Sequence, residues 1–121
     1  NLQVLINNLS LEGYEVVAAS DGEEVLSIVG NEDFDLLILD VMMPKLSGFE
    51  VTKELRTRHS LTELPILMLT AKTQLYDKVT AFEMGANDYL AKPCDKEELI
   101  ARVETLINLS KFNKELTALN R

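Results

Sequence analysis

Hydrophobic and polar residues alternate along this chain with two different periods, one typical of helices and one of buried strands. Leu2, Leu5, Ile6 and Leu9 follow the i, i+3, i+4, i+7 spacing of a helix with one buried face, which predicts a helix over residues 1–12. Further helices are predicted after the capping residues Ser20 and Asp21, over 48–58, over 75–84 and from about residue 95 onward. Short apolar segments between them predict strands at 14–19, 34–39, 66–69 and 88–91.

The two middle strands are apolar on both faces. Residues 36–39 and 66–69 contain only Leu, Ile and Met, and such strands belong in a parallel sheet that helices cover on both sides. Because strand and helix alternate four times, the pattern predicts an α/β fold with right-handed crossovers. A chain of 121 residues suits one domain, which we assign to residues 1–108.

The last predicted helix is longer than covering the sheet requires. Beyond residue 108 its apolar positions follow 3-4-3 spacing, the a/d pattern of a coiled coil: Leu109, Phe112, Leu116 and Leu119. Two heptads leave the choice open between a solvent-exposed tail and a functional extension over 109–121. As an extension, it would be a parallel dimer stalk or a connector to a further domain.

Charge and cysteine content exclude several classes of protein. Twelve Lys and Arg against twenty Asp and Glu give a net charge of -8, which argues against a nucleic-acid-binding or membrane-binding surface. The single cysteine, Cys94, excludes an internal disulfide framework and a CxxC site. Since no apolar run approaches the ~20 residues that span a bilayer, we expect a soluble domain in the cytoplasm.

Three chemically matched groups follow three successive strands. The strand at 34–39 leads to Asp40, the strand at 66–69 to Thr70-Ala71, and the strand at 88–91 to Lys92. The carboxyl ends of parallel strands share one edge, so a carboxylate, a hydroxyl and an ammonium should converge there. A carboxylate can attack a phosphoryl group and form an acyl phosphate. Lys92, the Thr70 hydroxyl and the Ala71 N–H would then stabilise the phosphoryl oxygens. A carbonyl in the loop after Asp40 would be a Mg²⁺ ligand.

The segments LILDVMMPKLSGFE, PILMLTAK and GANDYLAKP resemble the receiver domain of two-component response regulators over nearly all of residues 1–110. The resemblance implies a phosphoacceptor at Asp40, a Mg²⁺ ligand in the main-chain carbonyl of Met42, and switch residues at Thr70 and Tyr89. It also implies the lysine at Lys92, followed by a cis bond to Pro93. The implied fold is flavodoxin-like, with five parallel strands in the order 2-1-3-4-5. The implied phosphoryl donor is a histidine kinase or phosphotransfer domain of a phosphorelay, and the implied partner downstream is an output domain.

The sequence departs from this family at its start. Receivers have a first strand that ends in an acidic pair, which holds Mg²⁺, whereas this sequence opens at Asn1 with the helix that would follow that strand. The absent strand would lie centrally, between those at 14–19 and 34–39. Asp40 and one carbonyl make a poor Mg²⁺ site. We therefore expect this chain to be phosphorylated weakly or not at all.

Two alternative functions remain beside the phosphoacceptor. A pseudo-receiver would keep the fold as an interaction or dimerisation module and never take up phosphate. A phosphatase with an aspartate nucleophile would need a second Asp two residues after Asp40 as general acid, but Met42 occupies that position and cannot donate a proton. The sequence thus indicates no dedicated enzyme, at most Mg²⁺-dependent phosphoryl transfer to Asp40 and its own dephosphorylation.

Overall fold

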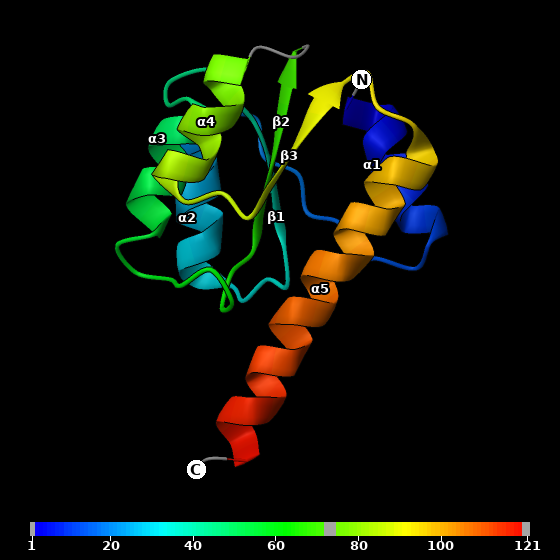
Figure 1. Ribbon diagram of the computed structural model, residues 1–121, viewed down its shortest axis with the longest axis vertical. Coiled ribbons are helices and arrows are strands. Elements are labelled where there is room, and N and C mark those ends of the chain that lie inside the picture. The colour runs from blue at the N-terminus through cyan, green and yellow to red at the C-terminus, as the bar shows by residue number, and fades with distance from the viewer. Residues whose placement is uncertain (1, 72–74, 120–121) are drawn as a thin grey trace.

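Helices and strands alternate along the computed structural model, which describes residues 2–71 and 75–119. The elements in chain order are α1 (Leu2–Leu11), α2 (Gly22–Asn31), β1 (Leu37–Asp40), α3 (Gly48–Leu55), β2 (Ile66–Ala71), α4 (Leu75–Met84), β3 (Asp88–Lys92) and α5 (Lys96–Leu119) (Figure 1). All five predicted helices and three of the four predicted strands are confirmed. The helix predicted over 48–58 ends three residues early because residues 56–58 form a turn.

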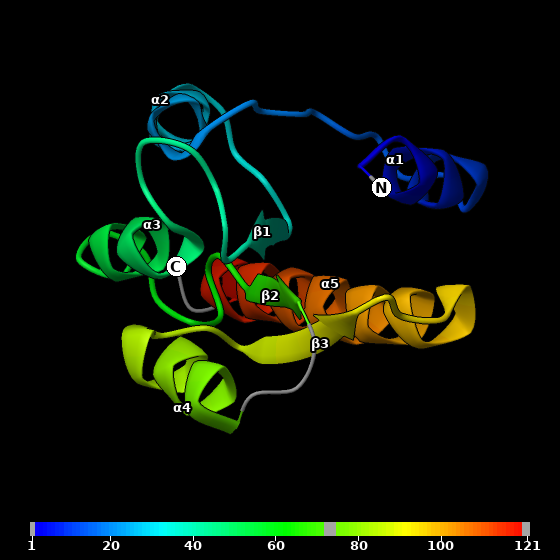
Figure 2. The same cartoon turned by 90° about the horizontal axis from the view of Figure 1, so that it is seen from above.

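The three strands form a parallel sheet in the order β1-β2-β3, with helices on both faces. Figures 1 and 2 show α2, α3 and α4 on one side of the sheet and α1 and α5 on the other. Each side has its own core cluster: Val51 and Ala81 belong to the first, Leu9 and Val103 to the second. The predicted α/β architecture with helices on both faces of a parallel sheet and a long C-terminal helix is confirmed.

The strand predicted at 14–19 is wrong. Residues 14–19 have no regular secondary structure, and an apolar groove of about 560 Å³ lies between them and β1. A strand needs a neighbour for its backbone hydrogen bonds, and β2 is the only strand that pairs with β1 within the described residues. The groove therefore lies where the resemblance to receivers expects a central strand.

Among residues 2–71 and 75–119, none of the helices combines the length and the apolar character that crossing a bilayer requires.

Candidate functional site

Asp40 and Lys92, which are 52 positions apart in the sequence, meet at the carboxyl edge of the sheet. Asp40 ends β1 and Lys92 ends β3, and the Lys92 ammonium forms an ion pair with Asp40 Oδ2. The two side chains keep 38% (Lys92) and 35% (Asp40) of their surface exposed. A carboxylate with a fixed cation beside it is thus open to a ligand from solvent.

The backbone of the following loop orients the second carboxylate oxygen. The Met42 N–H donates a hydrogen bond of 3.0 Å to Asp40 Oδ1. The Val41 N–H donates to the Leu69 carbonyl of β2 at 2.9 Å, so the chain leaves the sheet only after Asp40. Each oxygen of Asp40 therefore has one donor, while the Met42 side chain extends into solvent with 81% of its surface exposed.

Helix α3 begins directly against Asp40 because Gly48 has no side chain. A Cβ at Gly48 would lie 2.5 Å from the Asp40 carbonyl oxygen and 2.9 Å from Met68 Sδ. Ser47 caps the helix reciprocally with Glu50: the Glu50 N–H donates to Ser47 Oγ, and the Ser47 N–H donates to Glu50 Oε1. Sequence and packing together fix where the loop after Asp40 ends.

The same loop is held on its other side by the start of α2. The Gly22 N–H donates to the Pro44 carbonyl at 3.3 Å, and Lys45 pairs with Asp21 at 3.5 Å. Asp21 also caps α2 by accepting the Glu24 N–H, and this hydrogen bond lowers the pKa of Asp21. The pattern of the sequence predicted the cap, but not the link to Lys45, which adopts a φ of 69°.

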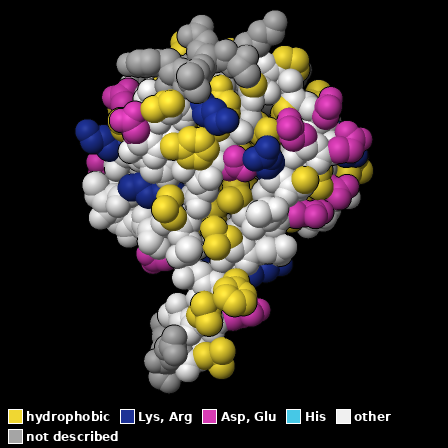
Figure 3. Space-filling view, viewed as in Figure 1, with side chains coloured by type: hydrophobic (Ala, Val, Ile, Leu, Met, Phe, Trp, Pro, Cys, Tyr) yellow, Lys and Arg dark blue, Asp and Glu magenta, His cyan; other side chains and the backbone are white. Residues whose placement is uncertain are grey.

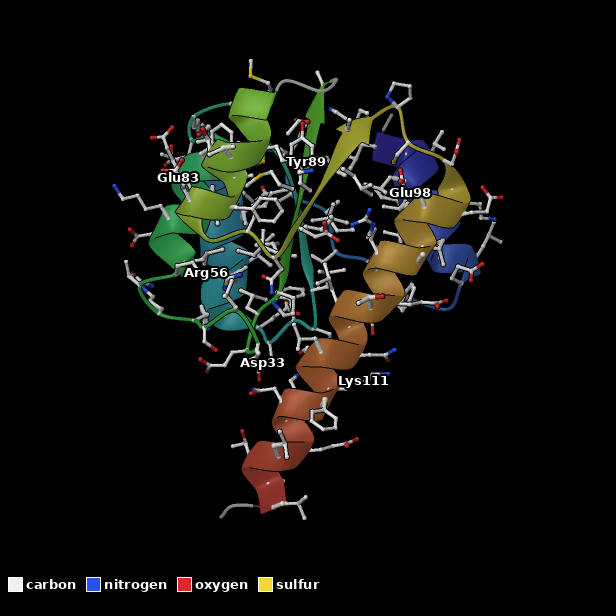
Figure 4. The ribbon with its side chains drawn as sticks, viewed as in Figure 1. Asp33, Arg56, Glu83, Tyr89, Glu98 and Lys111 are labelled. Atoms are coloured by element: carbon white, nitrogen blue, oxygen red, sulfur yellow. The ribbon has the colours of Figure 1, made fainter. Side chains whose placement is uncertain are left out.

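Two further predicted residues are Thr70 of β2 and Tyr89 of β3, and within the described residues neither hydroxyl forms a hydrogen bond with Asp40. Thr70 follows the residue of β2 that pairs with Asp40; its side chain is 1% exposed and its hydroxyl has no hydrogen-bond partner within the described residues. The same holds for the hydroxyl of Tyr89, whose ring packs in the core cluster of α3 and α4 (Figure 4). Buried hydroxyls without partners are uncommon in folded proteins and need an explanation.

Ala71 and the Lys92–Pro93 bond complete the predicted set. Ala71 pairs with Lys92 in the register of β2 and β3, and its exposed position places its backbone at the edge of the sheet. The bond between Lys92 and Pro93 is cis, as the resemblance implied. The sheet register thus brings these residues to the same edge as the ion pair.

A carboxylate flanked by an ammonium and by backbone and hydroxyl donors is suited to phosphoryl transfer, in which the protein supplies mainly positioning and positive charge. It is not suited to hydrolysis by the phosphatase route, since Met42 stands where the general acid would be.

Oxygen ligands for Mg²⁺ are few at this site. The described residues contain no group of three or more His, Cys, Asp or Glu arranged to hold a metal ion. The oxygens that the sequence analysis offers at this edge are the Asp40 carboxylate and a carbonyl of the loop after it. Mg²⁺ prefers octahedral oxygen coordination with one or two carboxylates. The residues present therefore do not by themselves make a tight Mg²⁺ site.

Comparison with known proteins places this geometry in a family. Residues 1–104 match the family described as "Response regulator receiver domain". The chain is 49% identical over 105 residues to the alkaline phosphatase synthesis transcriptional regulatory protein PhoP of Bacillus subtilis, covering 87% of this chain and 43% of that protein.

Solved structures of receiver domains and response regulators resemble this chain in both sequence and fold. A response regulator from Chloroflexus aurantiacus superposes with a TM-score of 0.83 at 44% identity, covering 88% of each chain. The receiver domain of the sensor histidine kinase PA1611 from Pseudomonas aeruginosa, solved with a magnesium ion in its active site cleft, gives 0.81 at 30% identity and covers 89% of this chain and 88% of that one. The resemblance inferred from the motifs is confirmed, and the chain belongs to the family of response regulator receiver domains.

Proposed function

We propose that Asp40 is the residue at which this receiver domain accepts a phosphoryl group from the phosphohistidine of a partner kinase or phosphotransfer domain. The observation that carries this proposal is the ion pair between Asp40 and Lys92 at an accessible sheet edge. A carboxylate oxygen of Asp40 attacks phosphorus, the bond from phosphorus to the histidine nitrogen breaks, and an acyl phosphate remains on Asp40.

The negative charge of the phosphoryl group would be stabilised by Lys92, Thr70 and Ala71. Phosphorylation adds a charge of about -1.5 to -2, and the Lys92 ammonium already lies beside the acceptor oxygen. The Thr70 hydroxyl, which is buried without a hydrogen-bond partner among residues 2–71 and 75–119, would donate to a phosphoryl oxygen, and the Ala71 N–H would donate to another. Tyr89 would then repack beside α4 and carry the change to the surface.

Receiver domains in general bind Mg²⁺, an ion that neutralises charge on a transferring phosphoryl group. We propose Asp40 and the Met42 carbonyl as its ligands here. Because the described residues include no group of three or more His, Cys, Asp or Glu that could hold a metal ion, we expect Mg²⁺ binding by this chain to be weak, and phosphorylation of this chain to reach low occupancy.

Intact-mass measurement after incubation with Mg²⁺ and a small phosphodonor tests the assignment. We expect a minor fraction to gain one phosphoryl group, which hydroxylamine removes as it does from acyl phosphates. Asp40→Asn should abolish the gain. Asp35→Asn, a change at another exposed carboxylate on the same strand approach, should leave it intact. Equal labelling of Asp40→Asn and the parent would reject Asp40, and near-full occupancy of the parent would reject the weak Mg²⁺ site.

A second candidate function is that of a pseudo-receiver, which serves only as an interaction module. It is favoured because the described residues contain no group of three or more metal-ligating side chains. No labelling of the parent with any donor, together with an unchanged fold, would support it over the phosphoacceptor.

The chain spans 43% of the length of the B. subtilis regulator that it matches. Any activity of a full-length regulator is therefore a proposal for this chain. We propose that the receiver controls an output domain. The names of the curated relatives make transcriptional regulation the candidate output, with DNA contacts outside this acidic domain.

A further inference from the structure

Helix α5 (Lys96–Leu119) carries two stripes of residues that face different directions. The first stripe packs on the sheet through Leu99, Val103 and Leu106, and all three are buried. Fully buried Ser110 continues it one turn further. The helix therefore stays against the domain beyond residue 108, where the sequence pattern had placed the boundary of the extension.

Polar contacts hold the next turn of this stripe. The Thr62 hydroxyl donates to Asn113 Oδ1 at 3.0 Å, and the Lys114 ammonium pairs with Asp35 at 2.6 Å. These contacts attach the helix to the segments that lead into β1 and β2. The rotation of α5 about its own axis is thereby set as far as Lys114.

The second stripe starts where the first becomes polar. It consists of Leu109, Phe112, Leu116 and Leu119, of which the last three are 61%, 45% and 81% exposed. At 3.6 residues per turn this stripe is rotated roughly 130° from the first. Figure 3 shows hydrophobic side chains gathered along this end of α5, and Figure 1 shows that this end of the helix protrudes from the rest of the molecule.

We propose that the second stripe binds the same stripe of a second copy of this chain, forming a short parallel two-stranded coiled coil over residues 109–119. The 3-4-3 spacing places Leu109 and Leu116 at a positions and Phe112 and Leu119 at d positions, the repeat that a partner helix in a coiled coil requires. This proposal is independent of phosphorylation at Asp40.

The charges beside the stripe favour an identical partner. Its flanking e and g positions are Asn108, Asn113 and Glu115, so a chain with a net charge of -8 has a single carboxylate there. In a parallel pair, Asn108 faces Asn113 of the second copy and no like charges meet. A partner of opposite charge would instead need a charged rim to recognise.

The attachment of α5 also leaves room for the second copy. Thr62 and Asp35 hold the body of the domain through Asn113, which borders the stripe, and through Lys114. The stripe residues Phe112, Leu116 and Leu119 stay exposed beside these contacts. Two copies joined along the stripe would therefore carry their domains on opposite outer sides.

The contact is small. Four side chains per copy bury less than the ~1,200 Å² at the lower end of standard stable interfaces. We therefore expect a reversible dimer whose population rises with protein concentration.

Sedimentation velocity of the 121-residue chain over a wide concentration range tests this inference. The parent should shift from monomer toward dimer as its concentration rises. Leu116→Lys, which places a charge in the stripe, should remain monomeric. Ala118→Lys, the same change on the same exposed turn but outside the stripe, should behave as the parent. A parent that stays monomeric throughout, or a dimer that Leu116→Lys leaves unchanged, overturns the proposal.

Disulfide trapping distinguishes the parallel arrangement from others. In a background with Cys94→Ser, the variant Leu116→Cys places two thiols opposite each other only when the helices are parallel and in register. Oxidation by dissolved oxygen should link this variant into dimers at least tenfold faster than Ala118→Cys. Equal rates for the two cysteines would overturn the assigned face and orientation.

Discussion

Arg56 provides the sharpest test of what holds this fold together, because one side chain bonds three separate segments. Its Nε donates to the Gly85 carbonyl at 2.7 Å, its Nη1 donates to three carbonyls of residues 59–64, and its Nη2 donates to Asn87 Oδ1 at 2.8 Å. Asn87 in turn accepts from the Ile66 N–H at the start of β2. The guanidinium, labelled in Figure 4, thus joins the end of α3, the end of α4 and the approach to β2.

The expected cost of removing this guanidinium follows from the acceptors it leaves. A part-buried acceptor that loses its donor costs about 1–3 kcal/mol. The Gly85 and Leu64 carbonyls are part-buried and hold the shorter bonds, while the Ser60 carbonyl is exposed and can bind water instead. Arg56→Met should therefore lower the free energy of unfolding by about 3 kcal/mol, a large part of the roughly 5–15 kcal/mol of a typical domain.

Urea denaturation followed by circular dichroism measures this effect, with Arg58→Met as the matched control. Arg58 lies two residues further along, its side chain is 69% exposed, and it forms an ion pair of 3.6 Å with Glu54, so its loss should cost below about 0.5 kcal/mol. Arg56→Lys, which keeps the charge but loses the planar fork, should fall between the two. If Arg56→Met and Arg58→Met unfold at the same urea concentration with equal slopes, the reasoning is refuted.

Two further predictions concern the loop that holds Asp40. Gly48→Ala should destabilise the domain by about 1–3 kcal/mol, because its Cβ meets the Asp40 carbonyl and Met68. Its control is Gly30→Ala in α2, where nothing lies within 4 Å of the added carbon; this change should instead stabilise the domain by about 0.5–1 kcal/mol in the same thermal or urea melts. The second prediction concerns pH: the lowered pKa of Asp21 means that its carboxylate stabilises the fold above its ordinary pKa of roughly 3.9, and that this contribution is lost as the pH falls through the lowered value. Asp21→Asn should thus be less stable than the parent near pH 7 and equal to it in strong acid; a difference that stays constant with pH would contradict this reading.

The elements that could be predicted from the sequence are those whose signals are local. Apolar periodicity located the helices, and the predicted cap at Asp21 lies next to the residues it serves. The strand at 14–19 failed because a strand depends on a neighbour that local sequence does not supply. Its residues have the composition of a strand, but they line a groove instead of pairing with β1.

The site was predictable where topology alone decides it. Once Asp40 and Lys92 end parallel strands of one sheet, their meeting follows from the geometry of the fold. The Arg56 network and the Lys45–Asp21 pair were missed, since each joins segments whose proximity appears only after packing. An arginine at a helix end is usually exposed on the surface. The residues next to Arg56 in the sequence give no signal that its side chain is half-buried.

The unpaired edge of β1 has a practical consequence for work with this chain. Within the described residues, the backbone of β1 bonds only to β2, and its other side opens onto the apolar groove. A hydrophobic strand with free amides and carbonyls can template the addition of extended polypeptide from any neighbouring molecule. We therefore expect aggregation of this chain at high concentration to begin at this edge.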